Sequence, residues 1–372
     1  MKKLTYEQKN NLKSRGYGSI WLALYAIVFL ACTIFADARH PDAHFEWLRG
    51  YGFAQYIPLW GNSLFAFAIL GMIIFFNFKV GAELNNCFVK SSNKKLIFLI
   101  GLMIMLPQFV PFFMILFYVY YGSYIADFQW NTTMIIYFVS VMCSWLLLIP
   151  YFFIVKKSRN YTKFNAIAFP LIAVIITLAL IGFFYLAIVR SWTTIILILI
   201  IPICTDTFAY FTGIFFGKHK LAPVISPKKT WEGAFGGLLG ALIVSVLLLF
   251  IYGYGEDKYF LQSNFFGAQY AFTSHIEIET GWWWMWVIII LFVCILSAVF
   301  GDLLFSLFKR KNDIKDFSSF LLGHGGILDR FDSYIIEIAV INFILLMIAV
   351  TSTLMNIDSV NRIFNVAALP IH

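Results

Sequence analysis

Long apolar runs alternate with short polar segments along most of this chain. Nine of these runs approach the ~20 residues that a helix needs to cross the apolar layer of a bilayer. They lack the short stretches of alternating polarity, ~10 residues each, that are typical of a transmembrane barrel. The pattern therefore predicts an all-α fold, a polytopic transmembrane helical bundle of about nine spans. The expected spans are residues 19–36, 58–78, 96–121, 133–155, 165–189, 192–216, 233–254, 283–305 and 333–355.

Two of these spans carry residues with a structural meaning of their own. The third contains Pro107 and Pro111, which remove backbone hydrogen bonds, so we expect that helix to be kinked or broken. Four tryptophans between positions 282 and 286 predict an interfacial aromatic belt where the eighth span enters the membrane.

The basic residues indicate an orientation. If the N-terminus is cytoplasmic, nine spans place nearly all of the 27 Lys and Arg residues on the cytoplasmic face, as the positive-inside rule predicts. The exceptions are Arg39, Arg49, Arg190, Lys258 and Arg362. The net charge of +8 is then explained by topology and by anionic headgroups. We therefore expect the lipid bilayer as a partner and no nucleic acid.

Charged residues make up 12% of the chain, against about 25% in soluble domains, so a polar segment inside the apolar pattern is informative. Residues 1–160, with about four spans, are predicted to be an N-terminal transmembrane scaffold, because their polar residues fall in connections. Residues 161–372 are predicted to be a C-terminal transmembrane catalytic region, because three unusual polar segments follow residue 200. The five cysteines have neither disulfide nor metal-ligand spacing.

The first polar segment is CTDTFAYFTGIFFGKHKL, residues 204–221. Asp206 lies inside the sixth span, and Tyr210 follows four residues later on the same helix face. Gly213 and Gly217 permit close helix packing. Asp206 is a candidate for a polar site, and a structural hydrogen bond to a neighbouring helix is the alternative.

The second segment is SPKKTWEGAFGG, residues 226–237. Lys228 and Lys229 precede a helix that is expected to begin near Trp231, with Thr230 as its N-cap and Glu232 in its first turn. A helix N-terminus preceded by lysines attracts phosphate. The alternative is that the lysines serve topology and that the three glycines form a packing seam.

The third segment runs from Gly301 to Ser333. Asp302, Ser306 and Lys309 fall on one face of the eighth helix, and Asp329 and Asp332 share a face at the start of the ninth. Carboxylates facing each other across two helices would repel unless a cation lay between them. Oxygen ligands with basic neighbours suit Mg²⁺ bound together with substrate phosphates.

In this third segment the chain resembles the phosphatidate cytidylyltransferases, also called CDP-diacylglycerol synthases. The segments DTFAYFTGIFFG and SPKKTWEG resemble further family blocks in the expected order, and the similarity covers roughly residues 165–355. The chain departs at Leu322, where the family usually has Pro or Gly, and at Ser318, where Gly is common. The matching positions of the third segment are Ser306, Lys309, Arg310, Lys315, Asp316, His324, Gly325, Gly326, Asp329, Arg330 and Asp332.

The resemblance implies the reaction of CTP with phosphatidate to give CDP-diacylglycerol and diphosphate. It also implies a requirement for Mg²⁺, with K⁺ as a companion ion, and it places Asp302 and Asp329 at metal-ligand positions. Lys309 and Asp332 complete the expected catalytic set, Asp332 by orienting basic side chains or metal-bound water. The residues expected to bind substrate are Ser226, Lys228, Lys229, Thr230, Glu232, Ser306, Arg310, His324, Gly325, Gly326 and Arg330.

The orientation argument agrees with this chemistry, because CTP is cytosolic and all three segments are expected on the cytoplasmic side of a bacterial-type cell membrane. The family also implies a homodimer. Three other functions are alternatives: a CTP-dependent lipid kinase of the dolichol or phytol type, a phosphotransferase of the CDP-alcohol family, and a cation-coupled transporter using Asp206, Asp302 and Glu337. The Asp-rich helix motif of the CDP-alcohol family is not found in the sequence. The complete HGG…DR…D ending favours the cytidylyltransferase over the kinase, and no inverted repeat supports the transporter.

Overall fold

The computed structural model describes residues 59–121, 139–189, 192–254, 280–321 and 325–355. These residues are mostly helical, as the apolar runs predict. The helices are α4 (Leu59–Leu84), α5 (Lys94–Tyr121), α7 (Leu148–Lys156), α8 (Lys163–Val189), α9 (Trp192–Phe216), α10 (Trp231–Tyr254), α13 (Thr280–Lys311) and α14 (Leu328–Met355), with a π-helix at Asn85–Val89.

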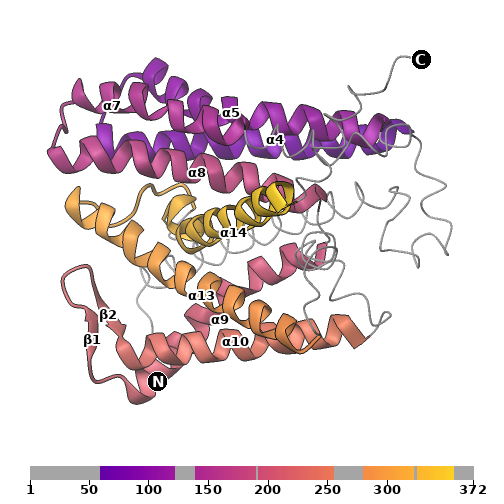
Figure 1. The fold of residues 1–372 in the computed structure, drawn as a ribbon. Helices are drawn as coiled ribbons and strands as arrows, with labels where there is room; N and C mark the ends of the chain where they lie inside the picture. Colours follow the sequence, from indigo (N-terminus) through magenta and orange to yellow (C-terminus); the bar gives the residue numbers. More distant parts are fainter. Residues whose placement is uncertain (1–58, 122–138, 190–191, 255–279, 322–324, 356–372) are drawn as a thin grey trace, which may run out of the picture.

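The helices form two groups joined by α14. Helices α4, α5, α7 and α8 pack together, and α9, α10 and α13 form the second group (Figure 1). Helix α14 packs against α8 on one side and against α13 and α9 on the other. An aromatic core lies beside this junction, where the Phe88 ring contacts the rings of Phe169 and Phe308 with centroids 5.6 Å away in each case.

Eight of the nine expected spans coincide with helix within the described residues, and the first, 19–36, lies outside them. The prediction of a break in the third span is wrong, because α5 continues through Pro107 and Pro111 as one helix. Helices α8 and α9 likewise contain Pro170 and Pro202. In membrane helices, neighbouring groups and local adjustment can satisfy the carbonyls that a proline leaves without a partner.

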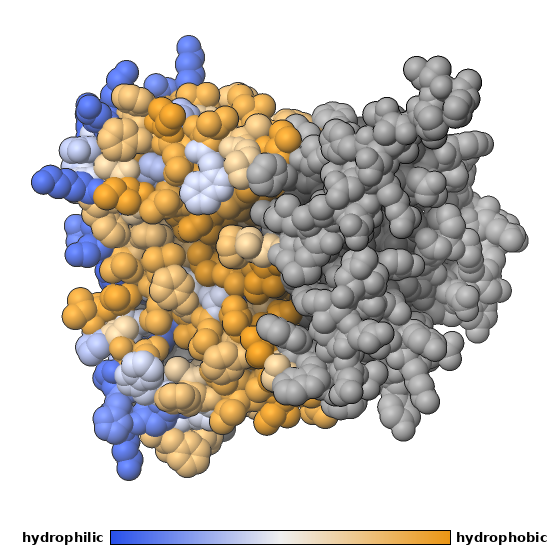
Figure 2. Space-filling model, in the orientation of Figure 1, coloured by the Kyte–Doolittle hydropathy of each residue, from blue (hydrophilic) through white to orange (hydrophobic). Residues whose placement is uncertain are grey.

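The exposed apolar surface of the helices is typical of a membrane protein. Five helical segments of the described residues are long and apolar enough to cross a membrane: Val139–Lys156, Lys163–Phe183, Ile196–Phe216, Trp231–Leu249 and Ile288–Lys311. Large apolar side chains such as Leu146, Ile167 and Phe215 are exposed on them. Figure 2 shows hydrophilic residues gathered at one end of an apolar body, at the left. The end of α13 and the segment between α9 and α10 lie at that end in Figure 1.

The segment between α9 and α10 corrects the all-α prediction. It forms a two-stranded antiparallel hairpin of β1 (Lys220–Ala222) and β2 (Ser226–Thr230). The strands are too short to show a period-two pattern in sequence, and Pro227 lies within β2. The hairpin matters because it carries the predicted substrate lysines.

Helices α9 and α10 are in close contact along a seam of small residues. A Cβ atom on Gly237 would lie 2.6 Å from the carbonyl oxygen of Thr205, and one on Gly233 would lie 2.8 Å from that of Ala209. The packing seam weighed for the glycines of the second segment is therefore present. Gly213 lies in the same seam, facing Gly233.

Candidate active site

One lysine–aspartate pair links the hairpin to α13. Lys229 at the end of β2 forms an ion pair with Asp302, and Ser306 one turn along α13 donates a hydrogen bond to the same carboxylate at 3.4 Å. Both charged side chains are about one-quarter exposed, at 26% and 25%. The predicted shared face of Asp302 and Ser306 is thus present, and the hairpin adds a cation to it.

Two further carboxylates, Asp206 on α9 and Asp332 on α14, lie near this pair. The charges of Asp206 on α9 and Asp302 on α13 both act on Asp332 of α14. The positive charge of Lys229 also acts on Asp206. Asp332 is buried, whereas Asp206 has an exposed surface. This arrangement favours the polar-site interpretation of Asp206, since its neighbours are charged groups of the site.

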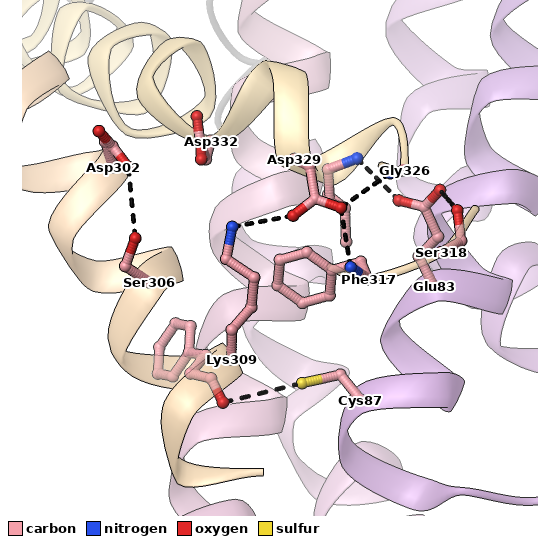
Figure 3. Close-up of polar contacts among 12 residues, drawn as sticks. Glu83, Cys87, Asp302, Ser306, Lys309, Phe317, Ser318, Gly326, Asp329 and Asp332 are labelled. Atoms are coloured by element: carbon pink, nitrogen blue, oxygen red, sulfur yellow. Dashed lines mark hydrogen bonds and ion pairs between the residues drawn. The ribbon is translucent and has the colours of Figure 1, made fainter. Parts of the chain in front are cut away.

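A second lysine–aspartate pair lies further along α13. Lys309 Nζ is 2.8 Å from Asp329 Oδ1, and the side chains are only 13% and 6% exposed. The other oxygen, Asp329 Oδ2, accepts hydrogen bonds from the backbone N–H groups of Phe317 and Gly326, both at 2.8 Å. Asp329 on α14 therefore binds both Lys309 of α13 and the backbone of the segment that precedes α14 (Figure 3). In this view Asp332 lies between Asp302 and Asp329.

The two glycines of the third segment are required by close approach. Gly325 has a positive φ of 81°, and a Cβ atom on it would lie 2.8 Å from Asp329 Oδ2. A Cβ atom on Gly326 would lie 2.5 Å from Glu83 Oε1. The backbone here thus passes between two carboxylates, which accounts for both glycines without a bound phosphate.

Glu83 is a residue that the sequence analysis missed. It lies at the end of α4 and is 2% exposed. Its Oε1 accepts hydrogen bonds from Ile327 N–H at 2.8 Å and Ser318 O–H at 2.7 Å, and its Oε2 accepts one from Leu328 N–H at 2.7 Å. The only available signal was a lone acidic residue just after an apolar run.

The environment of Glu83 has two opposing effects on its charge. Burial raises the pKa of this carboxyl, and the nearby charge of Asp329 acts in the same direction. The hydrogen bonds from Leu328, Ser318 and Ile327 act to lower the pKa. Two of these donors are backbone N–H groups at the start of α14, where a negative charge is stabilised by the helix dipole.

The start of α10 follows the sequence prediction. The helix begins at Trp231, and Thr230 Oγ1 accepts a hydrogen bond from Gly233 N–H at 3.2 Å, as expected of an N-cap. Glu232 lies in the first turn, where its carboxylate pairs with the His219 ring at 2.6 Å and accepts a bond from the His219 N–H. Glu232 thus links the first turn of α10 to His219, the residue just before β1 of the hairpin.

The remaining predicted substrate residues lie on the hairpin, on α13 and on α14, or outside the described residues. Lys228 is exposed in the middle of β2, and Ser226 is the first residue of that strand. Arg310 is exposed and donates a hydrogen bond at 3.4 Å to the carbonyl oxygen of Ile225 in the hairpin turn. Arg330 is exposed in the first turn of α14. His324 lies outside the described residues.

The carboxylates differ in how well they suit a metal ion. Asp302 is partly open to solvent, whereas both oxygens of Asp329 already accept hydrogen bonds. Among the described residues, no three Asp, Glu, His or Cys side chains are grouped closely enough to hold an ion alone. Oxygen donors of this kind do fit Mg²⁺, which proteins often bind through one or two carboxylates together with substrate phosphates.

Comparison with known proteins identifies the family. The sequence model of the cytidylyltransferase family matches residues 55–348, most of the chain. The chain belongs to the cytidylyltransferase family.

Curated bacterial relatives carry a more specific name. The chain is 36% identical over 194 residues to the phosphatidate cytidylyltransferase of Staphylococcus haemolyticus, covering 51% of this chain and 63% of that protein. It is 33% identical over 252 residues to that of Staphylococcus saprophyticus, covering 66% and 76%. A Mycoplasma pneumoniae protein that carries this name provisionally is 38% identical over 188 residues, covering 45% and 47%. The chain therefore spans between about half and three quarters of the length of these cytidylyltransferase relatives.

Proposed function

We propose that this protein is a phosphatidate cytidylyltransferase. A phosphate oxygen of phosphatidate attacks the α-phosphorus of CTP and forms a new phosphoanhydride bond. The bond between the α- and β-phosphates of CTP breaks, and diphosphate leaves. The membership of the cytidylyltransferase family and the names of the relatives support this assignment.

The observation that carries the proposal is the pair of lysine–aspartate contacts, Lys229–Asp302 and Lys309–Asp329, which join the hairpin and the start of α14 to α13. Both substrates are anions, so their mutual repulsion is the main obstacle to reaction. Transfers at phosphorus are catalysed mainly by positioning and by neutralising charge. We propose that Lys228, Lys229, Lys309, Arg310 and Arg330 bind phosphate oxygens, the arginines by paired hydrogen bonds.

No nucleophile from the protein is required, because ionised phosphatidate carries the attacking oxygen. The exposed apolar faces of the helices suit the acyl chains of the lipid, while the polar end suits the nucleotide. Of the other predicted substrate residues, we assign Thr230 and Glu232 to holding the hairpin and the start of α10 in place, because of their contacts with Gly233 and His219.

We further propose that Asp302 and Asp329 hold Mg²⁺ together with substrate phosphates, with K⁺ as a companion ion. When bound, the divalent ion supplies positive charge to the transferring phosphates. Asp302 has the more accessible carboxylate, and Asp329 would exchange its contact with Lys309. Asp332, near the charges of Asp302 and Lys309, would orient these groups, and Asp206 would add a fourth carboxylate.

The wider arrangement is also a proposal: nine spans, a cytoplasmic N-terminus, and a site on the cytoplasmic side of a bacterial cell membrane. We propose the division into a scaffold of residues 1–160 and a catalytic region of residues 161–372, and assembly as a homodimer. Labelling of single cysteines placed at the N-terminus and in the hairpin tests the sidedness, and light scattering of the purified protein tests the dimer.

The test of function is an assay of detergent-purified protein with labelled CTP, with and without phosphatidate and Mg²⁺. We expect diphosphate and labelled CDP-diacylglycerol to form only when both lipid and metal are present. Release of CDP with a phosphorylated lipid alcohol would instead identify a CTP-dependent kinase. The absence of any CTP turnover in folded protein would contradict both.

A further inference from the structure

One stripe of α4 contacts the segment that leads into α14. Phe75, Lys79 and Glu83 are spaced four residues apart and therefore share a face of the helix. The Lys79 ammonium lies 3.9 Å from the centroid of the Phe320 ring, and the Phe75 and Phe320 rings are 6.0 Å apart. Glu83 contacts Ser318 and Ile327, which lie on either side of Phe320 in the sequence. Helix α4 thus holds this segment through both Lys79 and Glu83.

We propose that Glu83 is a positioning residue for the active site: it holds the described parts of the loop before α14, residues 317–321 and 325–328, so that Asp329 and Lys309 keep their places. The proposal deepens the proposed cytidylyltransferase function and rests on it for its kinetic part. It gives a residue of the N-terminal scaffold a defined role in turnover.

The geometry supports action through the loop. Gly326 donates its N–H to Asp329 while its Cα lies against the Glu83 carboxylate. The next two N–H groups, of Ile327 and Leu328, are both bound to Glu83. Three consecutive peptide N–H groups are thus shared between two carboxylates, one on α4 and one on α14. Without Glu83, two of these buried donors lose their acceptor, and the loop must move to find another.

A buried polar contact elsewhere on α4 provides a matched control. The side chains of Asn77 and Gln108 form two hydrogen bonds, at 3.0 and 2.9 Å, and both residues are 2% exposed or less. This pair joins α4 to α5. Replacing Asn77 therefore removes a buried polar contact of the same helix that is made with α5 and not with the loop.

The experiment compares Glu83→Gln, Glu83→Ala and Glu83→Asp with Asn77→Leu, all as full-length protein in detergent. Turnover is measured per folded enzyme with CTP and phosphatidate, and thermal unfolding is recorded in parallel. We expect Glu83→Gln and Glu83→Ala to lower kcat about 10- to 100-fold, with little change in the KM for CTP. Glu83→Asp, which keeps both acceptor oxygens, should regain part of this loss. Asn77→Leu should lower the unfolding temperature and leave kcat per folded enzyme unchanged.

A second measurement does not depend on activity. Hydrogen–deuterium exchange of the peptide containing residues 317–328 should be at least about tenfold faster in Glu83→Ala than in the wild type, and unchanged in Asn77→Leu. If Glu83→Ala does not fold, Ser318→Ala removes a single hydrogen bond from Glu83 and should give a smaller change in the same peptide.

The outcomes separate the two proposals. Wild-type protein that turns over no CTP would defeat the proposed function, while the exchange data would still test whether Glu83 holds the loop. Normal kcat per folded enzyme in Glu83→Gln and Glu83→Ala would overturn the positioning role, even if both variants unfold at lower temperature. Unchanged exchange of residues 317–328 in Glu83→Ala would overturn it as well.

Discussion

The two lysine–aspartate pairs of the site differ in their surroundings more than in their chemistry. Lys229–Asp302 joins a short hairpin to the last third of α13 and is about one-quarter exposed. Lys309–Asp329 is nearly buried, and its aspartate also holds two backbone N–H groups of the loop. Separating the first pair should cost little free energy, whereas separating the second would also destabilise the fold.

This difference suggests a division of labour. A partly hydrated ion pair contributes little to stability, so Lys229 and Asp302 are available to exchange partners with substrate and metal. A buried pair resists separation, because removal of one partner leaves an uncompensated charge. Lys309 and Asp329 are therefore expected to act in both folding and turnover, and single substitutions can separate these effects.

The largest effect is expected from Asp329→Asn. This change removes the charge that pairs with Lys309 and weakens the acceptor for Phe317 and Gly326 N–H. We expect turnover to be lost and the free energy of unfolding to fall by about 3 kcal/mol. Thermal unfolding in detergent and the CTP assay measure the two effects separately. Full activity in this variant would remove Asp329 from the proposed site.

Asp302→Asn should abolish turnover to a similar extent without the same loss of stability. The carboxylate is the accessible candidate ligand of the divalent ion, and its partner Lys229 is partly hydrated. The unfolding temperature should stay close to that of the wild type. CTP turnover is measured over a range of Mg²⁺ concentrations, and wild-type turnover at any of them would contradict the proposed role.

A smaller effect is expected from the hairpin lysines, which offer an internal comparison. Lys229→Ala should raise the KM for CTP and lower kcat/KM about tenfold or more, because Lys229 reaches Asp302. Lys228→Ala should have the weaker effect, because that side chain is exposed on the same strand. Steady-state kinetics of both variants decide the order, and equal effects would mean that the contact with Asp302 is unimportant.

The smallest effect is expected from Glu337→Gln. Glu337 is fully buried in α14, and among the described residues neither of its carboxylate oxygens has a hydrogen-bond partner. Because the amide has nearly the same shape, CTP turnover per folded enzyme should be unchanged. A loss of turnover would instead extend the proposed site deeper along α14.

Local patterns were sufficient to predict part of this site. Apolar runs predicted the described helices, and the residue types around Thr230 predicted the start of α10. The spacing of Asp302 and Ser306 predicted a shared face, which their hydrogen bond bears out. Each of these features depends on residues that are neighbours in the chain, so helical periodicity and capping preferences describe them.

Features that depend on distant segments were not predicted. Glu83 binds residues that are 244 and 245 positions away, and no local pattern indicates such a contact. The hairpin strands were missed because they are short and lie between two long helices. The continuity of α5 through its prolines was also missed, because proline disfavours a helix interior in water, whereas helices in a membrane protein tolerate it.

The glycine seam between α9 and α10 has a mechanical consequence. Because the two backbones touch where side chains would otherwise intervene, neither helix can slide or rotate against the other without a clash. Asp206 on α9 and Lys229, two residues before α10, should therefore move together with the two helices. A movement of this unit relative to α13 would separate Lys229 from Asp302.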